Sequence, residues 1–395
     1  MIRYDFTTST CRENTNAEKY ALREKLFGTE DVLPVWVADM DIDTPGFVLD
    51  AVKKRLEHPN MGYEEMPRSA FEAQIEWMKQ EHNIEFKREE MFYSHSVVAS
   101  INAAIEAFTD KGDKIIVQTP VYPPFFHSVL KHERELLKNP LMQRDDGSYG
   151  FDIDDLRSKI DEKTKLLLLC SPHNPVGRVW TKEELKEISD ICYENGIVVF
   201  SDEIHCDLVY RPNVHVPFAS LGQRARDISV TAIGVGKTFN MAGFAISTIA
   251  VSNPELREKL KKVYERIHFA EGATLSHVAF ETAYRNGNQW VAELKEHLKN
   301  NYDMLSALCE KYTPIIKITP IEATYLAWLD CRGMKLTDKE LRNFFVEEAR
   351  LGLNAGLSFG REGSGFMRLN FALSRVKMFE VIKRLDKALS LKYCK

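Results

Sequence analysis

The strongest constraint on the fold is a regular alternation of short apolar runs and helical patterns between residues 97 and 251. Apolar side chains recur on one helical face from Val97 to Phe108, and a strand-like run at 114–118 follows the turn at Gly112. Strands that alternate with helices are typical of βαβ units, which form a mostly parallel sheet buried on both faces. The sequence therefore predicts an α/β fold.

Four further β-rich runs continue this pattern. They are Leu166–Cys170, Ile197–Phe200, Ile228–Ile233 and Ile246–Val251. Between the first two, a helix is expected to begin at Thr181, where Glu184 completes a capping box, and to end near Asn195-Gly196. The alternation thus extends through the whole middle of the chain.

After about residue 286 the pattern changes to a long amphipathic stretch, from Trp290 to Leu305, that leads into an α+β segment. We expect a large domain with a mostly parallel central sheet flanked by helices, over residues 46–285. A smaller α+β domain is expected to combine residues 1–45 with 286–395.

Composition excludes several functional classes. No run approaches the ~18 apolar residues of a membrane span, and the start of the chain has no signal-peptide pattern. The formal net charge of −5 gives no reason to expect a nucleic-acid partner. The seven dispersed cysteines form no C-x-x-C pair, which argues against a disulfide framework or a zinc site. We expect a cytoplasmic protein that binds no metal.

Chemically active side chains follow three successive predicted strands. They are Asn174, Asp202 and Lys237. Each has an ordinary explanation by itself, since Asn-Pro forms turns, aspartate caps helices and loop lysines are usually exposed. However, ligands of a parallel sheet bind at the carboxyl ends of its strands, where these three would meet.

An amide, a carboxylate and a lysine on one sheet edge suit pyridoxal 5'-phosphate. This cofactor needs a lysine for a Schiff base and a carboxylate that faces its ring nitrogen. Asn174 and His205 would supply donors near its phenolic oxygen. Backbone N–H groups at Val97 and Val98, where a helix begins, would hold its phosphate.

Several motifs resemble fold-type I pyridoxal-phosphate enzymes, and among them the cystathionine β-lyase, or C–S lyase, branch of the class I/II aminotransferase superfamily. The similarity runs from about residue 15 to 372. The motifs are Val-Ala-Asp-Met-Asp (37–41), Thr-Pro-Val-Tyr-Pro-Pro-Phe (119–125), Ser-Pro-His-Asn-Pro-Val-Gly-Arg (171–178), Asp-Glu-Ile-His (202–205), Lys-Thr-Phe-Asn-Met-Ala-Gly (237–243) and Phe-Met-Arg-Leu-Asn (366–370).

The resemblance implies a role for each matching residue. Lys237 would form the Schiff base and move the Cα proton, Asp202 would pair with the pyridinium nitrogen, and Tyr122 would stack on the ring. Arg368 would bind the carboxylate of an amino-acid substrate, although a structural salt bridge is a competing explanation. Tyr63 would reach the cofactor phosphate of a neighbouring subunit, which implies a homodimer with shared sites.

The chain departs from the family pattern at the phosphate site. The family usually carries Ser-x-Ser-Lys, and this chain has Gly234-Val-Gly236-Lys237. Many relatives outside the lyase branch have arginine where this chain has Ala245. We expect the two glycines to let backbone amides approach the phosphate, which Tyr63 would also hold.

The resemblance favours a carbon–sulfur β-lyase, and three alternatives compete with it. A P-loop is disfavoured because Thr231 occupies the position of its first glycine. A non-catalytic regulatory or binding protein would have no need for the whole set of catalytic residues. Transamination of an L-amino acid starts, like β-elimination, with removal of the Cα proton, so the catalytic residues leave that choice open.

Overall fold

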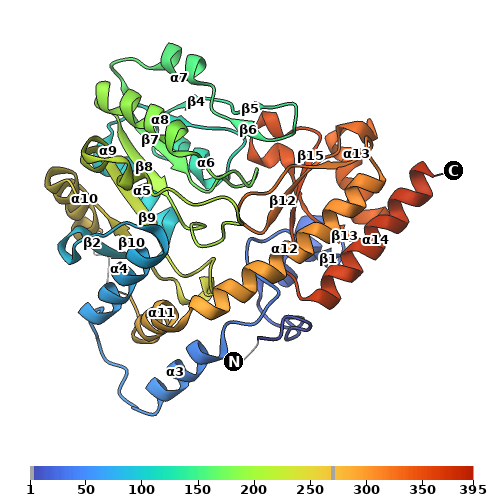
Figure 1. Ribbon diagram of the computed structural model, residues 1–395, viewed down its shortest axis with the longest axis horizontal. Coiled ribbons are helices and arrows are strands. Elements are labelled where there is room, and N and C mark those ends of the chain that lie inside the picture. Colours follow the sequence, from blue (N-terminus) through green and yellow to red (C-terminus); the bar gives the residue numbers. More distant parts are fainter. Residues whose placement is uncertain (1–3, 268–271, 395) are drawn as a thin grey trace.

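The computed structural model describes residues 4–267 and 272–394, and it is built around a seven-stranded sheet (Figure 1). Strand β10 runs antiparallel to both of its neighbours, and the pairs between β9, β8, β7, β3 and β4 are all parallel. In spatial order the strands are β2 (Met91–Ser94), β10 (Ser247–Ala250), β9 (Ser229–Ile233), β8 (Val198–Asp202), β7 (Thr164–Cys170), β3 (Lys114–Val117) and β4 (Glu135–Lys138). The predicted mostly parallel sheet is confirmed.

Strand β7 shows why the strands of the central sheet are apolar at nearly every position. Leu166 and Leu168 join the core beneath α5 (Val97–Phe108) and α10 (Pro254–Arg266). Leu167 and Leu169 join the core beneath α8 (Lys182–Glu194). Successive side chains of a strand point to opposite faces, so a sheet covered on both sides needs apolar residues at every position. The helices around the sheet are α5 (Val97–Phe108), α6 (Pro124–Lys131), α7 (Ile153–Lys159), α8 (Lys182–Glu194), α9 (Gln223–Ile228) and α10 (Pro254–Arg266).

The start of α8 follows the local prediction. The backbone N–H of Glu184 donates to Thr181 Oγ1 at 3.2 Å, and the N–H of Thr181 donates to the Glu184 carboxylate at 2.9 Å. Both parts of the expected capping box are therefore present. It satisfies two helix-terminal donors that would otherwise lack partners.

A second, antiparallel sheet lies in the C-terminal part of the chain, with strands β11 (Lys317–Ile318), β12 (Leu326–Asp330), β15 (Phe366–Asn370) and β14 (Asn354–Ala355) in that order. Helices α12 (Asn288–Lys311), α13 (Asp338–Asn343) and α14 (Arg375–Tyr393) accompany it. Near the N-terminus, β1 (Leu33–Pro34) pairs in parallel with β13 (Leu351–Gly352). This arrangement agrees with the proposed grouping of 1–45 with 286–395, which remains a proposal.

The remaining elements complete the fold around these two sheets. Helix α11 (Thr274–Asn286) packs against α3 (Gly46–Leu56) and α4 (Arg68–His82). Helices α1 (Glu18–Ala21) and α2 (Arg23–Phe27) precede β1, and strands β5 (Met142–Gln143) and β6 (Tyr149–Gly150) form a hairpin. None of the helices within 4–267 and 272–394 is long and apolar enough to cross a membrane.

Candidate active site

The three predicted strand ends meet at one edge of the central sheet. Strands β7, β8 and β9 are parallel neighbours, with Cys170 in register with Asp202 and Asp202 in register with Ala232. The loops that leave them surround a cavity of about 200 Å³. Its lining includes Lys237, Asp202, Asn174, His205, Tyr122, Val97, Val98 and Gly236. Eight of the predicted site residues are thus brought together.

Lys237 lies in this cavity and points toward the N-terminal segment. Its Nζ donates a hydrogen bond to the backbone carbonyl of Ala38 at 2.7 Å. Burial, reinforced by the positive charge of Arg368, lowers the pKa of Lys237 to about 8. About a tenth of the amine is therefore unprotonated, and able to act as a nucleophile, at pH 7.

Asp202 ends β8 inside the protein. Its carboxylate accepts a hydrogen bond from the backbone N–H of Ile204 at 3.1 Å. Burial raises the pKa of Asp202 to about 7, although the charge of Lys237 opposes this rise. A cationic N–H donor placed against this carboxylate would stabilise its ionised form.

Arg368 is a buried cation on β15 that lies outside the cavity lining, stacks over the Phe359 ring and donates its hydrogen bonds to neutral oxygens. Its Nη1 donates to Asn174 Oδ1 at 3.0 Å, and its Nη2 donates at 2.7 Å to both the Trp36 carbonyl and Asn354 Oδ1. Within the described ranges no carboxylate forms an ion pair with Arg368, so a structural salt bridge does not explain this residue. Burial lowers the pKa of Arg368 to about 10, and an anionic ligand would reverse this effect.

The first turn of α5 closes one side of the cavity. Ser96 is its N-cap, and its hydroxyl accepts the N–H of Ala99 at 3.2 Å. Val97 and Val98 line the cavity directly after this cap. Backbone N–H groups and the positive end of the helix dipole make such a terminus suitable for a phosphate.

The two glycines of the expected phosphate loop have different surroundings. Gly236 lines the cavity, but Gly234 does not. A Cβ atom at position 234 would lie 3.0 Å from Ser247 Cβ and 3.1 Å from Ile204 Cδ1. The missing side chain of Gly234 therefore allows β10 to pack closely. That the backbone amides of both glycines also serve the phosphate stays a prediction.

The other expected site residues differ in exposure. His205 is buried, and burial lowers its pKa well below the usual value, so its ring is neutral. Tyr122 is partly buried, and its ring borders the cavity. Tyr63 is fully exposed in the single chain and lies outside the cavity lining.

Sequence reasoning missed the residues that support this site. Ala38 holds Lys237 through its carbonyl, and Tyr325 donates to the same carbonyl at 2.9 Å. Asn354 is the register partner of Arg368 across β14 and β15. The 37–41 motif gave a signal for Ala38, but nothing local indicates Asn354, because its role arises from strand pairing.

The donors and acceptors in the cavity suit pyridoxal phosphate. Lys237 offers an amine, Asp202 a buried carboxylate, and α5 a helix N-terminus beside the same space. Two buried nitrogens, Arg368 Nε and His205 Nδ1, have no hydrogen-bond partner in the described structure. The cofactor and a bound anionic substrate would supply the hydrogen-bond partners that these two nitrogens lack. The residues of the cavity therefore fit pyridoxal phosphate.

Comparison with known proteins agrees with this geometry. The family model described as aminotransferase class I and II matches residues 32–385. Cystathionine beta-lyase PatB of Bacillus subtilis is 37% identical over 380 residues, which cover 96% of this chain and 98% of that protein.

Solved structures of pyridoxal-phosphate-bound proteins are similar to this chain over nearly its whole length. Cystalysin from Treponema denticola, which contains a pyridoxal 5'-phosphate cofactor, superimposes with a TM-score of 0.95 at 34% identity, covering 100% of both chains. The pyridoxal-phosphate-bound C–S lyase from Staphylococcus hominis has a TM-score of 0.90 at 33% identity, covering 98% of each chain.

Proposed function

Because this chain belongs to the class I and II aminotransferase family of pyridoxal-phosphate-dependent enzymes, we propose that it is a carbon–sulfur β-lyase. Its substrate would be cystathionine or a related S-substituted cysteine. The observation that carries the proposal is the convergence of Lys237 and Asp202 on one cavity, together with the buried cation Arg368, which is hydrogen-bonded to Asn174 in the cavity lining. Full-length similarity to cystathionine β-lyase of Bacillus subtilis and to the C–S lyase of Staphylococcus hominis favours elimination over transamination.

Each wall of the cavity would hold a different part of the cofactor. Lys237 would attach it, Asp202 would face its ring nitrogen, and Tyr122 would cover its ring. Asn174 and His205 would lie near its phenolic oxygen, and the N–H groups of Val97 and Val98 would bind its phosphate. When bound, pyridoxal phosphate supplies an electron sink that stabilises negative charge at the substrate Cα.

Lys237 is the proposed general base. Its lowered pKa leaves the amine able to accept the Cα proton near neutral pH, which is the condition for efficient proton transfer. The Ala38 carbonyl oxygen lies 2.7 Å from Nζ and accepts a hydrogen bond from it, which fixes the direction of the lysine side chain. A positioned amine removes the proton from one face of the substrate only.

Arg368 is the proposed binding group for the substrate α-carboxylate. Its guanidinium is held on two sides by Asn174 and Asn354, which fixes the plane of its donors. A planar fork suits bidentate binding of a carboxylate. Binding there would orient the Cα–H bond toward Lys237.

The net reaction breaks the Cβ–S bond and consumes one water molecule. The sulfur leaves as a thiol after taking up a proton, and the remaining carbon skeleton is released as pyruvate and ammonia. The same residues would start a transamination, but that reaction requires a keto-acid acceptor. The acceptor requirement is therefore the feature that separates the two activities.

We also propose a cytoplasmic homodimer with shared active sites. Tyr63 is fully exposed in the single chain, and exposed Leu49, Leu56 and Met61 lie on or after α3, which supports a subunit contact there. All the cysteines are unpaired in the described part of the chain, which suits a reducing compartment.

One experiment tests the proposed reaction. The purified protein is expected to show the visible absorbance of bound pyridoxal phosphate and to release pyruvate and thiol from L-cystathionine without a keto acid. Lys237→Ala should lose both. A visible band with turnover only in the presence of a keto acid would instead identify an aminotransferase.

A further inference from the structure

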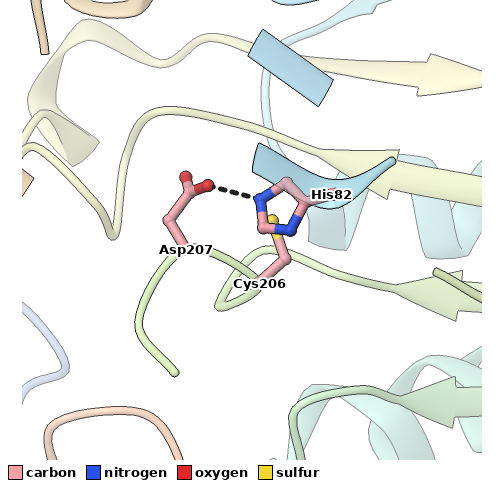
Figure 2. A group of neighbouring side chains, drawn as sticks. All are labelled: His82, Cys206 and Asp207. Carbon is pink, nitrogen blue, oxygen red and sulfur yellow. Dashed lines mark hydrogen bonds and ion pairs between the residues drawn. The ribbon is translucent and has the colours of Figure 1, made fainter. Parts of the chain in front are cut away.

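A second cavity, of about 360 Å³, borders the segment that continues from His205. His82, Cys206, Asp207 and His215 contribute to its lining. His82 Nε2, Cys206 Sγ and an Asp207 carboxylate oxygen lie within 4.8 Å of one another (Figure 2). These three side chains come from the end of α4 and from the loop after β8, and they are almost fully buried.

Asp207 is held as a metal-binding carboxylate would be. Trp77 Nε1 donates to Asp207 Oδ1 at 2.8 Å, and Thr238 Oγ1 donates to Asp207 Oδ2 at 2.7 Å. His82 Nε2 is 2.7 Å from the same Oδ1. A dashed line marks this contact in Figure 2. Hydrogen bonds from outer partners orient the ligands of metal sites and tune their affinity.

His215 is a second histidine beside this group, and its ring centroid lies 5.5 Å from that of His82. Its Nε2 is 2.9 Å from the buried carboxylate of Glu203, which also accepts hydrogen bonds from Ser201 Oγ and the Phe218 N–H. Because an ionised carboxylate only accepts hydrogen bonds, the hydrogen of this contact belongs to His215 Nε2. In a neutral imidazole the lone pair is then on Nδ1. That atom is buried and has no hydrogen-bond partner in the described structure. This nitrogen could accept a hydrogen bond from a water molecule bound to an ion in the cavity.

We propose that His82, Cys206 and Asp207 bind one Zn²⁺ ion, with a water molecule from the cavity as the fourth ligand. Nitrogen and sulfur donors with one carboxylate favour Zn²⁺ over Mg²⁺ or Ca²⁺. The ion takes the place of the hydrogen between His82 Nε2 and Asp207, and that hydrogen moves to the other ring nitrogen, Nδ1. The N···O separation widens to the ~3.3 Å that tetrahedral Zn²⁺ requires. The Cys206 thiol releases its proton to solvent when the Zn–S bond forms.

The site adjoins the catalytic machinery through two short connections. Cys206 directly follows His205, which lines the cofactor cavity, and Asp207 binds the hydroxyl of Thr238, which directly follows Lys237. A bound ion therefore fixes both segments at once. The spacing of cysteines in the sequence could not indicate this site, because only Cys206 takes part and His82 is distant in the chain.

The test is Zn²⁺ titration of untagged, cofactor-loaded protein against a chromophoric chelator, combined with X-ray absorption spectroscopy of the loaded ion. We expect one equivalent per chain and one sulfur neighbour at ~2.3 Å. Cys206→Ser and His82→Gln should each weaken binding at least ~10-fold, and Cys206→Ser should remove the sulfur signal. Cys192→Ser is the matched control, because Cys192 is also buried but lies on α8, away from this cavity.

Three results would overturn the proposal: no binding of Zn²⁺, equal binding by the wild type and Cys206→Ser, or a bound ion without sulfur in its shell. Lys237→Ala separates this outcome from that of the proposed enzyme activity. This variant cannot attach the cofactor but should still bind one equivalent of Zn²⁺. That result would show that the ion is bound away from the catalytic lysine.

Discussion

The Nζ atom of Lys237 is hydrogen-bonded to the backbone carbonyl of Ala38 at a distance of 2.7 Å, across 199 residues of sequence. This contact joins the loop after β9 to the segment between β1 and α3. Tyr325 donates to the same carbonyl, so three distant parts of the chain meet at the catalytic amine. The N-terminal segment is therefore part of the site.

The pH dependence of cofactor attachment follows from the lowered pKa of Lys237. Only the unprotonated amine attacks an aldehyde, so the rate at which the cofactor-free protein binds pyridoxal phosphate should rise with pH and level off above a midpoint near the pKa of about 8. Following the visible band after mixing at a series of pH values measures this rate. A rate that is independent of pH across this midpoint would contradict the prediction.

The same pKa shift predicts a change in stability. Lys237 has a pKa of about 8 in the folded protein and 10.5 as its ordinary value, so the unfolded chain binds the proton more tightly between these limits. The free energy of unfolding of the cofactor-free protein should therefore rise with pH in this window, relative to Lys237→Met, which cannot titrate. Denaturant titration of both proteins gives the difference.

Replacing Asp202 should lower turnover without abolishing cofactor binding. In Asp202→Asn the cofactor nitrogen loses a charged hydrogen-bond partner, which is worth about 1.5–3 kcal/mol. We expect kcat to fall roughly 10- to 150-fold while the visible band persists. An unchanged kcat would show that Asp202 does not face the ring nitrogen.

The role of Arg368 is tested by lysine substitution. Arg368→Lys keeps the charge but loses the planar fork, so KM for L-cystathionine should rise roughly 10-fold or more. Arg178→Lys is the matched control, because Arg178 is also buried but forms ion pairs with Glu184 and Glu322. That change should lower the melting temperature and leave KM unaltered. Equal effects on KM would assign Arg368 a structural role.

The phosphate loop is best tested at Gly236. A Cβ at position 234 would lie only 3.0 Å from Ser247 Cβ, so its neighbours must shift by a few tenths of an ångström and Gly234→Ser should destabilise the protein by about 1–3 kcal/mol. The nearest atom to a Cβ at position 236 is Ala242 Cα at 3.6 Å, which is an ordinary contact. Gly236→Ser should therefore fold normally and bind the cofactor roughly 2- to 10-fold more tightly through one added hydrogen bond. Equilibrium dialysis measures the cofactor affinity of the wild type and of Gly236→Ser. Equal affinities would mean that the backbone amides alone hold the phosphate.

Shared active sites are tested by mixing two inactive proteins. If Tyr63 serves the neighbouring subunit, a hybrid of Tyr63→Ala and Lys237→Ala contains one intact site and one doubly defective site. Random reassociation should then restore about a quarter of the sites. If Tyr63 serves its own subunit, each half of the hybrid is defective and activity stays at the level of the separate variants.

Much of the catalytic core was predictable from local sequence. Asp202 and Lys237 follow apolar runs, and parallel strands bring their carboxyl ends to one edge, so their convergence follows from the pattern of strands and loops. The N-terminus of α5 beside the cavity was predictable for the same reason. The family resemblance added Arg368, for which position along the chain gives no such argument.

Other features were decided only by tertiary structure. The support of Arg368 by Asn354 depends on the register of β14 and β15, and the crowding at Gly234 depends on how closely β10 approaches. The meeting of His82 with Asp207 spans 125 residues. Periodicity along a chain shows which side of an element is buried, but it does not specify which distant element covers that side. That choice is made by packing between whole segments, whose shapes exist only in the folded protein.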